Sequence, residues 1–281
     1  MKDAPLPAFE LLDPGAYNRL TVQTSRGCPH RCEFCAASIL ITDKYKQKPV
    51  DKVLAEIDKI QSIWKRPFVE FADDNSLINR EYWHTLLPEL KKRRVRWFAE
   101  TDLSVANDEV LLKAMRESGC AQVLIGLESP DMSSMNKLEM RANWKYKTWQ
   151  HYKESIRKIQ SHGIRVIGCF ILGLDGHHLN VFDDVYLFAN ELELFDIQIT
   201  IQTPFPGTPL YERLKSEQRL IEECNWNKCT LFDINFRPTD MSVDELKNGY
   251  MQLAEKLYSR ESTNWRREKF KENVRSLRKA G

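Results

Sequence analysis

The chain has 281 residues, of which 42% are hydrophobic, so it is long enough to bury a full core in one α/β domain. Lysine and arginine total 42 against 40 aspartate and glutamate, and the formal net charge of +2 gives no reason to expect a nucleic-acid partner. The apolar runs are too short to cross a membrane, and the first residues lack the apolar stretch of a secretory signal. These features predict a cytoplasmic protein without a membrane span.

Six short runs rich in β-forming residues alternate with runs of helical periodicity. The expected strands cover residues 20–24, 68–72, 95–99, 122–127, 164–172 and 197–203. The expected helices lie within residues 50–64, 107–119, 149–163 and 182–192, and a last long helix follows a capping box of Ser242 and Glu245. Strands separated by helices imply βαβ units and a parallel sheet that curls into a full or partial barrel. Ligands of such a sheet sit at the carboxyl ends of its strands.

The cysteines are unevenly distributed. The chain contains seven, and Cys28, Cys32 and Cys35 lie within eight residues directly after the first expected strand. A disulfide framework would be spread along the chain, whereas tight clustering indicates metal ligation. The spacing Cys-x3-Cys-x2-Cys lets three thiolates bind three irons of a small cluster. Because ordinary [4Fe–4S] electron carriers use four cysteines, one iron would stay open for a non-protein ligand.

Two simpler interpretations of the cysteine loop stay open at this point. One is a zinc site, and the other is a set of three unligated core cysteines. Zinc needs a fourth ligand, and His30, inside the loop, is poorly placed to complete a tetrahedron with its neighbours. The spacing therefore favours an iron–sulfur cluster.

Five sequence blocks follow the expected strands in order. They are Thr24–Pro29, Phe71–Asn75, Ile125–Ser129, Ile171–Gly176 and Thr203–Leu210. With these blocks the chain resembles the radical S-adenosylmethionine (SAM) superfamily, and most closely the radical SAM half of the cobalamin-binding radical SAM proteins. The resemblance implies a TIM-like partial (β/α)6 barrel over residues 19–240. An N-terminal segment, 1–18, would precede it, and a C-terminal helical extension, 241–281, would follow.

The resemblance also implies a reaction. A [4Fe–4S] cluster held by Cys28, Cys32 and Cys35 would bind SAM at its open iron and cleave it reductively to a 5′-deoxyadenosyl radical. This radical would abstract hydrogen from a substrate that the sequence does not identify. A reductant such as flavodoxin or ferredoxin would supply the electron, and the protein would position the cofactors and exclude competing reactions.

Carboxylates and an amide at the strand ends are the first residues that the resemblance assigns to SAM. Asp73, Asp74 and Asn75 follow the second strand, where the family contacts the SAM amino group, and oxygen acceptors suit an ammonium there. Glu100 ends the third strand and Glu128 ends the fourth. Either carboxylate is placed to accept hydrogen bonds from the ribose hydroxyls.

An aromatic residue and a glycine are the other expected contacts of SAM. Phe34 lies between the last two cysteines, where the family puts an aromatic beside the adenine. Gly173 would let the main chain approach the adenine closely. The adjacent histidines, His177 and His178, are expected to be an exposed pair in a polar loop.

Alternative functions follow from where the chain departs from its resemblance. The related proteins usually carry a cobalamin-binding domain ahead of this part, and none is recognisable here. Cobalamin is therefore an open cofactor that the residues of this chain do not support, and one alternative is a fragment of a cobalamin-dependent radical methyltransferase. A second is a tRNA methylthiotransferase-like enzyme, although no RNA-binding module is recognisable. A third, without catalysis, is a zinc-stabilised binding module.

Overall fold

The computed structural model describes residues 1–37 and 44–280, with the main chain alone described for 277–280. It divides into two compact units. The first unit comprises Met1–Cys28, Lys44–Ile125 and Ser155–Val166, and the second comprises the rest of the described residues. The cysteine loop therefore begins in the first unit and continues in the second.

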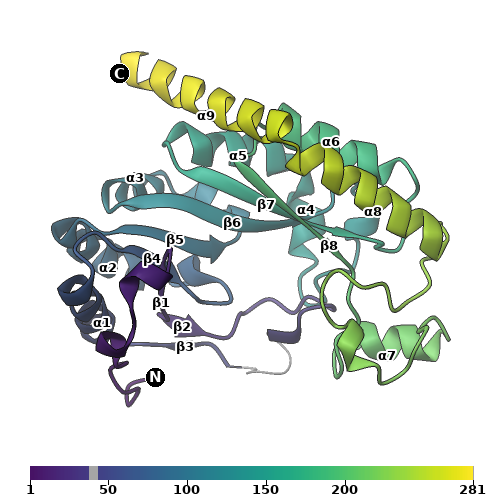
Figure 1. The fold of residues 1–281 in the computed structure, drawn as a ribbon, viewed down its shortest axis with the longest axis horizontal. Helices are drawn as coiled ribbons and strands as arrows, with labels where there is room; N and C mark the ends of the chain where they lie inside the picture. Colours follow the sequence, from purple (N-terminus) through teal and green to yellow (C-terminus); the bar gives the residue numbers. More distant parts are fainter. Residues whose placement is uncertain (38–43, 281) are drawn as a thin grey trace. The chain divides into compact units, whose positions relative to one another are not determined.

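Six strands of the described chain form one sheet in the order β1-β4-β5-β6-β7-β8 (Figure 1). Their bounds are Leu20–Val22 (β1), Phe68–Phe71 (β4), Arg96–Thr101 (β5), Cys120–Glu128 (β6), Arg165–Leu172 (β7) and Asp196–Ile201 (β8). The pairs β1–β4, β4–β5, β5–β6 and β7–β8 are parallel. Parallel strands that follow one another in sequence need crossover connections, which the helices supply. The predicted α/β class with six parallel strands is confirmed.

The helices connect these strands and extend beyond them. Their bounds are Val50–Ile63 (α1), Arg80–Arg93 (α2), Glu109–Glu117 (α3), Trp144–Thr148 (α4), Tyr152–Ser161 (α5), Val181–Glu191 (α6), Pro209–Ser216 (α7), Val243–Tyr258 (α8) and Arg260–Ala280 (α9). The predicted capping box is present, since Ser242 and Glu245 each bond the other's main-chain N–H at the start of α8. No helix within residues 1–37 and 44–280 combines the length and apolar composition needed to cross a bilayer.

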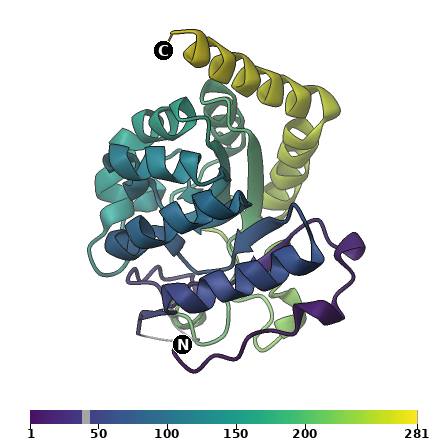
Figure 2. The same ribbon diagram turned by 90° about the vertical axis from the view of Figure 1, so that its left-hand side faces the viewer.

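A buried aromatic cluster fixes α2 to the sheet of the first unit. Trp83 of α2 packs edge-on against Phe71 of β4, with ring centroids 5.2 Å apart, and stacks on Trp97 of β5 at 5.7 Å. All three rings are fully buried, and rings of this size contribute large hydrophobic areas to a core. Helices α1, α2 and α3 pack side by side along the same unit (Figures 1 and 2). The end of β4, where Asp73–Asn75 follow, is thereby held rigidly.

The second unit is built around β7, β8 and the C-terminal helices. Helix α8 lies against α6, and α9 continues from it. Phe270 of α9 packs edge-on against Phe195 at 5.5 Å, and Arg267 donates to Asp196 at 2.7 Å. The predicted C-terminal helical extension is therefore present and packed through side chains of α9.

Some details of the fold differ from expectation. Strands β2 (Ser25–Arg26) and β3 (Lys46–Gln47) form a short antiparallel pair that the sequence did not predict, because two residues carry no readable period. Val110 begins the apolar stripe by which the sequence predicts a helix within residues 107–119, yet it is 70% exposed. It lies in the first turn of α3, while Leu111, Leu112 and Met115 provide the buried face.

Candidate functional site

The start of the cysteine loop is held by Asp73, which follows β4 in the first unit. One carboxylate oxygen, Oδ1, accepts the main-chain N–H groups of Thr24 at 2.7 Å and Ser25 at 2.8 Å, and Oδ2 accepts the Thr24 hydroxyl at 2.5 Å. Asp73 is only 3% exposed. Burial raises its pKa, although the donors from Ser25 and Thr24 act in the opposite direction. Asp73 therefore fixes the chain just ahead of Cys28.

The two residues after Asp73 make different contacts. Asp74 accepts the main-chain N–H of Gly27 at 2.8 Å, so a second carboxylate holds the loop next to Cys28. Asn75 donates through Nδ2 to Asp102 at 2.7 Å. Its carbonyl oxygen, Oδ1, is buried and has no hydrogen-bond partner within the described part of the chain. The structure thus brings the predicted Asp73, Asp74 and Asn75 together with the loop, and leaves an acceptor of Asn75 available.

Glu100 lies on β5 in the same unit, one residue before the strand ends. Its side chain is exposed to solvent. Partial desolvation together with the negative charges of Glu70 and Asp74 raises the pKa of Glu100. The carboxylates of Glu100 and Asp74 therefore share a negative environment that favours a cationic partner.

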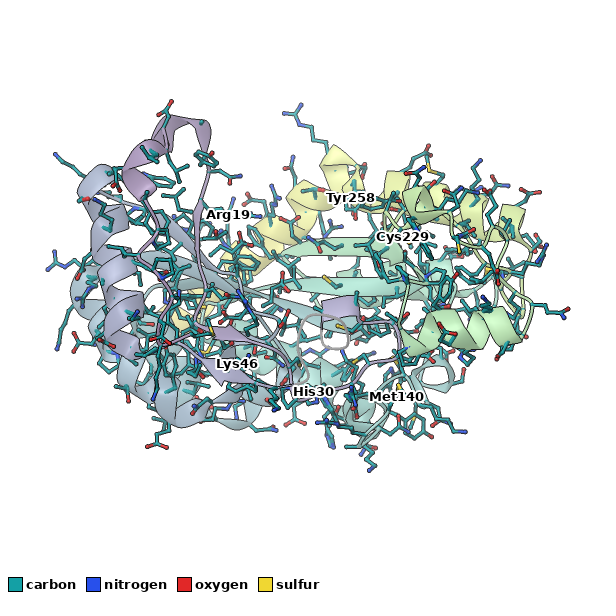
Figure 3. All side chains as sticks on the ribbon, turned by 90° about the horizontal axis from the view of Figure 1, so that it is seen from below. Arg19, His30, Lys46, Met140, Cys229 and Tyr258 are labelled. Carbon is teal, nitrogen blue, oxygen red and sulfur yellow. The ribbon has the colours of Figure 1, made fainter. Side chains whose placement is uncertain are left out.

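Further along the loop, in the second unit, a different carboxylate binds the main chain. Glu139 accepts the N–H groups of Arg31 at 3.1 Å, Arg141 at 3.0 Å and Ala142 at 2.8 Å. Burial alone would raise its pKa, but these N–H donors outweigh burial and lower it. The N–H of Met140 donates to the Arg31 carbonyl at 2.8 Å, and Figure 3 shows His30 and Met140 as neighbours. Glu139 carries no signal in the sequence, because its partner Arg31 is distant in the chain.

An arginine provides a second anchor for this part of the loop. Arg213 of α7 donates to both oxygens of Glu33, at 2.8 and 3.2 Å, and to Asp175 at 2.6 Å. Asp175 also accepts from Arg219 at 2.6 Å. The fork geometry of arginine makes such paired contacts directional. Glu33, the residue after Cys32, is therefore tied to the loop that follows β7.

A cavity of about 350 Å³ adjoins this network in the second unit. Its lining comprises Glu33, Ser133, Ser134, Asn136, Lys137, Leu138, Leu174, Asp175, Gln202 and Arg213. Gln202 follows β8 and is almost fully buried, and its Oε1 has no hydrogen-bond partner among the described residues. The cavity therefore presents both charged groups and a buried acceptor near Glu33.

Glu128 ends β6 as predicted, but its partner was not foreseen. Its Oε1 accepts from Lys145 Nζ at 2.5 Å, and Lys145 also donates to the Gly126 carbonyl at 2.8 Å. Glu128 adopts a positive φ of 63°, which is strained for a residue with a side chain. The sequence carries no signal for Lys145, because lysines are mostly exposed and periodicity does not reveal a buried one.

Three loop residues from the sequence analysis lie in the second unit. Phe34 is half-buried. Gly173 has φ 85°, and a Cβ there would lie 2.8 Å from Phe236 and 2.9 Å from Leu246, so packing as well as backbone conformation requires glycine. The expectation of an exposed histidine pair is wrong for His177. This residue is 2% exposed and its Nε2 bonds the Ser129 hydroxyl at 3.0 Å, so burial lowers its pKa to about 4.

The three cysteines of the loop have suitable donor chemistry for a cluster. Cys28, Cys32 and Cys35 are not joined in disulfides among the described residues, and Cys32 is buried whereas the other two are half-buried. In residues 1–37 and 44–280, no three His, Cys, Asp or Glu side chains converge where they could hold one metal ion. A [4Fe–4S] cluster makes a different demand, because each thiolate binds a separate iron. Three thiols on one loop, anchored by Asp73 and Glu139, fit that demand.

Comparisons with known proteins place the chain in a family. Residues 22–189 match the radical SAM superfamily, and residues 208–281 match a domain of unknown function, DUF4070. An uncharacterised methyltransferase of Synechocystis sp. is 32% identical over 262 residues, which are 90% of this chain and 48% of that protein. The hopanoid C-2 methylase of Rhodopseudomonas palustris is 30% identical over 79% of this chain and 42% of its own length. The chain spans about half the length of the curated relatives it matches.

A solved structure supports the fold. The radical SAM methyltransferase TsrM of Kitasatospora setae, with cobalamin and a [4Fe–4S] cluster bound, superposes with a TM-score of 0.61 at 20% identity. The match covers 71% of this chain and 37% of that protein. The family model spans more than half of the chain, from β1 into α6. The chain therefore belongs to the radical SAM superfamily, whose enzymes use a [4Fe–4S] cluster and S-adenosylmethionine.

Proposed function

We propose that this radical SAM enzyme transfers a methyl group to a carbon atom of its substrate. The observation that carries methyl transfer is the similarity to methyltransferases over most of the chain. The relatives from Synechocystis sp., Rhodopseudomonas palustris and Chlorobaculum tepidum are named as methyltransferases or methylases and align with 79 to 90% of this chain. Hopanoid and bacteriochlorophyllide, in the names of two of them, are large polycyclic molecules. We infer a substrate of that class.

The proposed cluster ligands are Cys28, Cys32 and Cys35. When bound, the cluster and SAM supply an electron-driven cleavage of the sulfonium to methionine and a 5′-deoxyadenosyl radical. The protein's part is to hold the ligands still. Asp73 fixes Thr24 and Ser25 before the first cysteine, and Glu139 fixes Arg31 before the second. Fixed ligands reduce the reorganisation that accompanies electron transfer and chemistry.

The SAM contacts are proposals that the geometry refines. Because both oxygens of Asp73 are already occupied by the loop, we assign that residue to positioning. The unpartnered carbonyl oxygen of Asn75 and the carboxylate of Asp74 remain as acceptors for the SAM ammonium. Glu100 and Glu128 stay the candidates for the ribose hydroxyls.

The adenine contacts rest on the family resemblance. Phe34 is proposed to lie beside the ring, and Gly173 is proposed to approach it through the main chain. The contacts of Gly173 with Phe236 and Leu246 give this glycine a packing role as well. A reductant, with flavodoxin or ferredoxin as the proposed kind, completes the set of partners.

The test is an anaerobic assay of the chain reconstituted with iron and sulfide. We expect about four irons per chain, as a three-thiolate [4Fe–4S] site implies. Dithionite and SAM should then yield 5′-deoxyadenosine, and added cobalamin should yield S-adenosylhomocysteine, the product that remains when SAM gives up its methyl group. Cys32→Ser should lose the iron and both products.

The two products test radical cleavage of SAM and methyl transfer separately. 5′-Deoxyadenosine without S-adenosylhomocysteine, with and without cobalamin, would leave radical cleavage standing and overturn methyl transfer. A fully reconstituted sample that yields neither product would overturn both. SAM carrying a deuterated methyl group confirms the origin of any methyl group that is transferred.

A further inference from the structure

A short segment from Glu139 to Lys145 packs along the cysteine loop in the second unit. Beyond the main-chain contacts of Glu139, Arg141 Nη1 donates to the Pro29 carbonyl at 2.9 Å. The His30 and Trp144 rings lie with centroids 4.9 Å apart. Cys32 itself forms an isolated β-bridge with Glu139. Lys145, the residue after Trp144, therefore belongs to the immediate surroundings of the loop.

Lys145 and Glu128 form a charge pair that is shielded from water at both ends. The two residues are 7% and 6% exposed, and Nζ lies 2.5 Å from Oε1. Charges in such surroundings act over longer distances than charges in water, because little solvent screens them. Most other ion pairs of the described chain involve exposed side chains, and the buried Lys48–Glu56 pair belongs to the first unit. In the second unit, the Lys145–Glu128 pair therefore differs from the exposed pairs in being poorly screened by water.

The ammonium of Lys145 is held at Glu128, at the end of the segment whose Glu139 pairs with Cys32. Burial disfavours the charged lysine, but the negative charge of Glu128 and the Cys32 thiolate outweigh burial and raise its pKa. Its two donations, to Glu128 at 2.5 Å and to the Gly126 carbonyl at 2.8 Å, are the contacts of a charged ammonium. A fixed positive charge beside the loop, shielded from water, stabilises negative charge on the sulfur of Cys32.

We propose that the Lys145–Glu128 pair sets the reduction potential of the cluster, with Lys145 raising it and Glu128 moderating that effect. The inference rests on the proposed ligation by Cys32. Reduction adds an electron to a centre that already carries anionic thiolates, so a nearby buried cation favours the reduced form. Glu128 offsets part of the cation's field and keeps the ammonium in place by its hydrogen bond. Lys145 is on this view a positioning and electrostatic residue, one that touches neither substrate nor SAM.

The experiment is a redox titration of the reconstituted chain without SAM, followed by the electron paramagnetic resonance of the reduced cluster. Lys145→Met should move the midpoint potential to more negative values, because the cation is lost. Glu128→Gln has nearly the same shape and should move it to more positive values, because the cation is no longer offset. Lys153→Met is the matched control, since it removes a lysine from the exposed pair with Glu191 in the same unit, and it should leave the midpoint unchanged.

The proposal predicts shifts of the midpoint potential in opposite directions for Lys145→Met and Glu128→Gln. A purely structural role would shift both variants in the same direction or neither, and either result overturns the inference. If Lys145→Met fails to load a cluster, the near-isosteric Glu128→Gln decides alone. Weaker SAM binding at an unchanged potential would reassign Lys145 to the cofactor and overturn the proposal. If the wild-type chain assembles no cluster, the proposed function falls too, whereas a cluster of unchanged potential in both variants overturns the pair alone.

Discussion

Two carboxylates hold successive parts of the cysteine loop, and their pKa values are shifted in opposite directions. Asp73 in the first unit and Glu139 in the second are 3% and 1% exposed, and each accepts at least two main-chain N–H groups. Burial raises the pKa of Asp73, whereas at Glu139 burial is outweighed by N–H donors and the pKa is lowered. Low exposure alone therefore does not decide the charge state. The charge state of a buried carboxylate depends on both the extent of its burial and the number of hydrogen-bond donors to its charged form.

The largest effect should come from removing the anchor in the first unit. Asp73→Ala leaves two main-chain N–H groups and the Thr24 hydroxyl without their acceptor in a buried place. We expect the free energy of unfolding to fall by about 3 kcal/mol and the iron content after reconstitution to fall several-fold. Urea denaturation of the apo chain and iron analysis measure the two effects. Asp74→Ala, which removes one acceptor, should cost about 1 kcal/mol, and an equal loss would contradict the ranking.

A smaller effect on folding stability should appear on acidification, and its sign should differ between the two anchors. The lowered pKa of Glu139 gives stability that is fully present above its ordinary value of 4.5 and is lost as pH falls through the folded-state pKa. The raised pKa of Asp73 does the reverse, because its ionisation weakens the folded state as pH rises above 3.8 through the folded-state pKa. The stability deficit of Glu139→Gln should therefore shrink between about pH 7 and about pH 3.5, while that of Asp73→Asn should grow.

Denaturant titrations of the two variants and the wild type across that range measure these slopes. Each deficit is the difference from wild type at the same pH, so titrations elsewhere in the chain cancel to first order. Slopes of the same sign for both variants would show that the two anchors do not differ in the way the structure indicates.

The smallest effect should come from the partly exposed arginine anchor. Arg213→Lys keeps a positive charge but cannot bridge Glu33 and Asp175 with a planar fork. Because all three side chains retain some contact with water, the expected loss in the free energy of unfolding is about 1 kcal/mol or less. Arg93→Lys removes a comparable fork to Asp58, far from the cysteines in sequence. Only Arg213→Lys should slow the release of 5′-deoxyadenosine, and a matching loss in Arg93→Lys would refute a local role.

The sequence predicted the sheet well and its side-chain network poorly. Strands β4 and β7 are readable because apolar and β-branched residues fill buried positions. A helix cap at Asn107 or Asp108 is readable because both precede an apolar stripe, and in the structure Asp108 is the cap. Helix α2 was not predicted, since Pro88 and a basic last turn obscure its period, although four buried side chains hold it. Periodicity is a local property, and these elements are local.

The hydrogen-bond partners of the candidate site residues could not be predicted from the sequence. Glu139 meets Arg31 across 108 positions, and Arg213 meets Glu33 across 180. No spacing rule reaches that far, so the site was predicted as a set of residue types at strand ends without the anchors between them. Asp73 shows the consequence, because the structure places it on the loop and leaves Asn75 with the available acceptor.

The strained backbone of Glu128 has a consequence for related sequences. Glycine would relieve about 1 kcal/mol of strain at a φ of 63°, so backbone conformation alone favours losing this side chain. Losing it would strand a buried ammonium, at a cost of about 3 to 5 kcal/mol, which is the larger quantity. Replacement of Glu128 by glycine should therefore be tolerated only together with substitution at 145. We expect the two positions to covary among homologues, with the acidic and basic side chains retained or replaced as a pair.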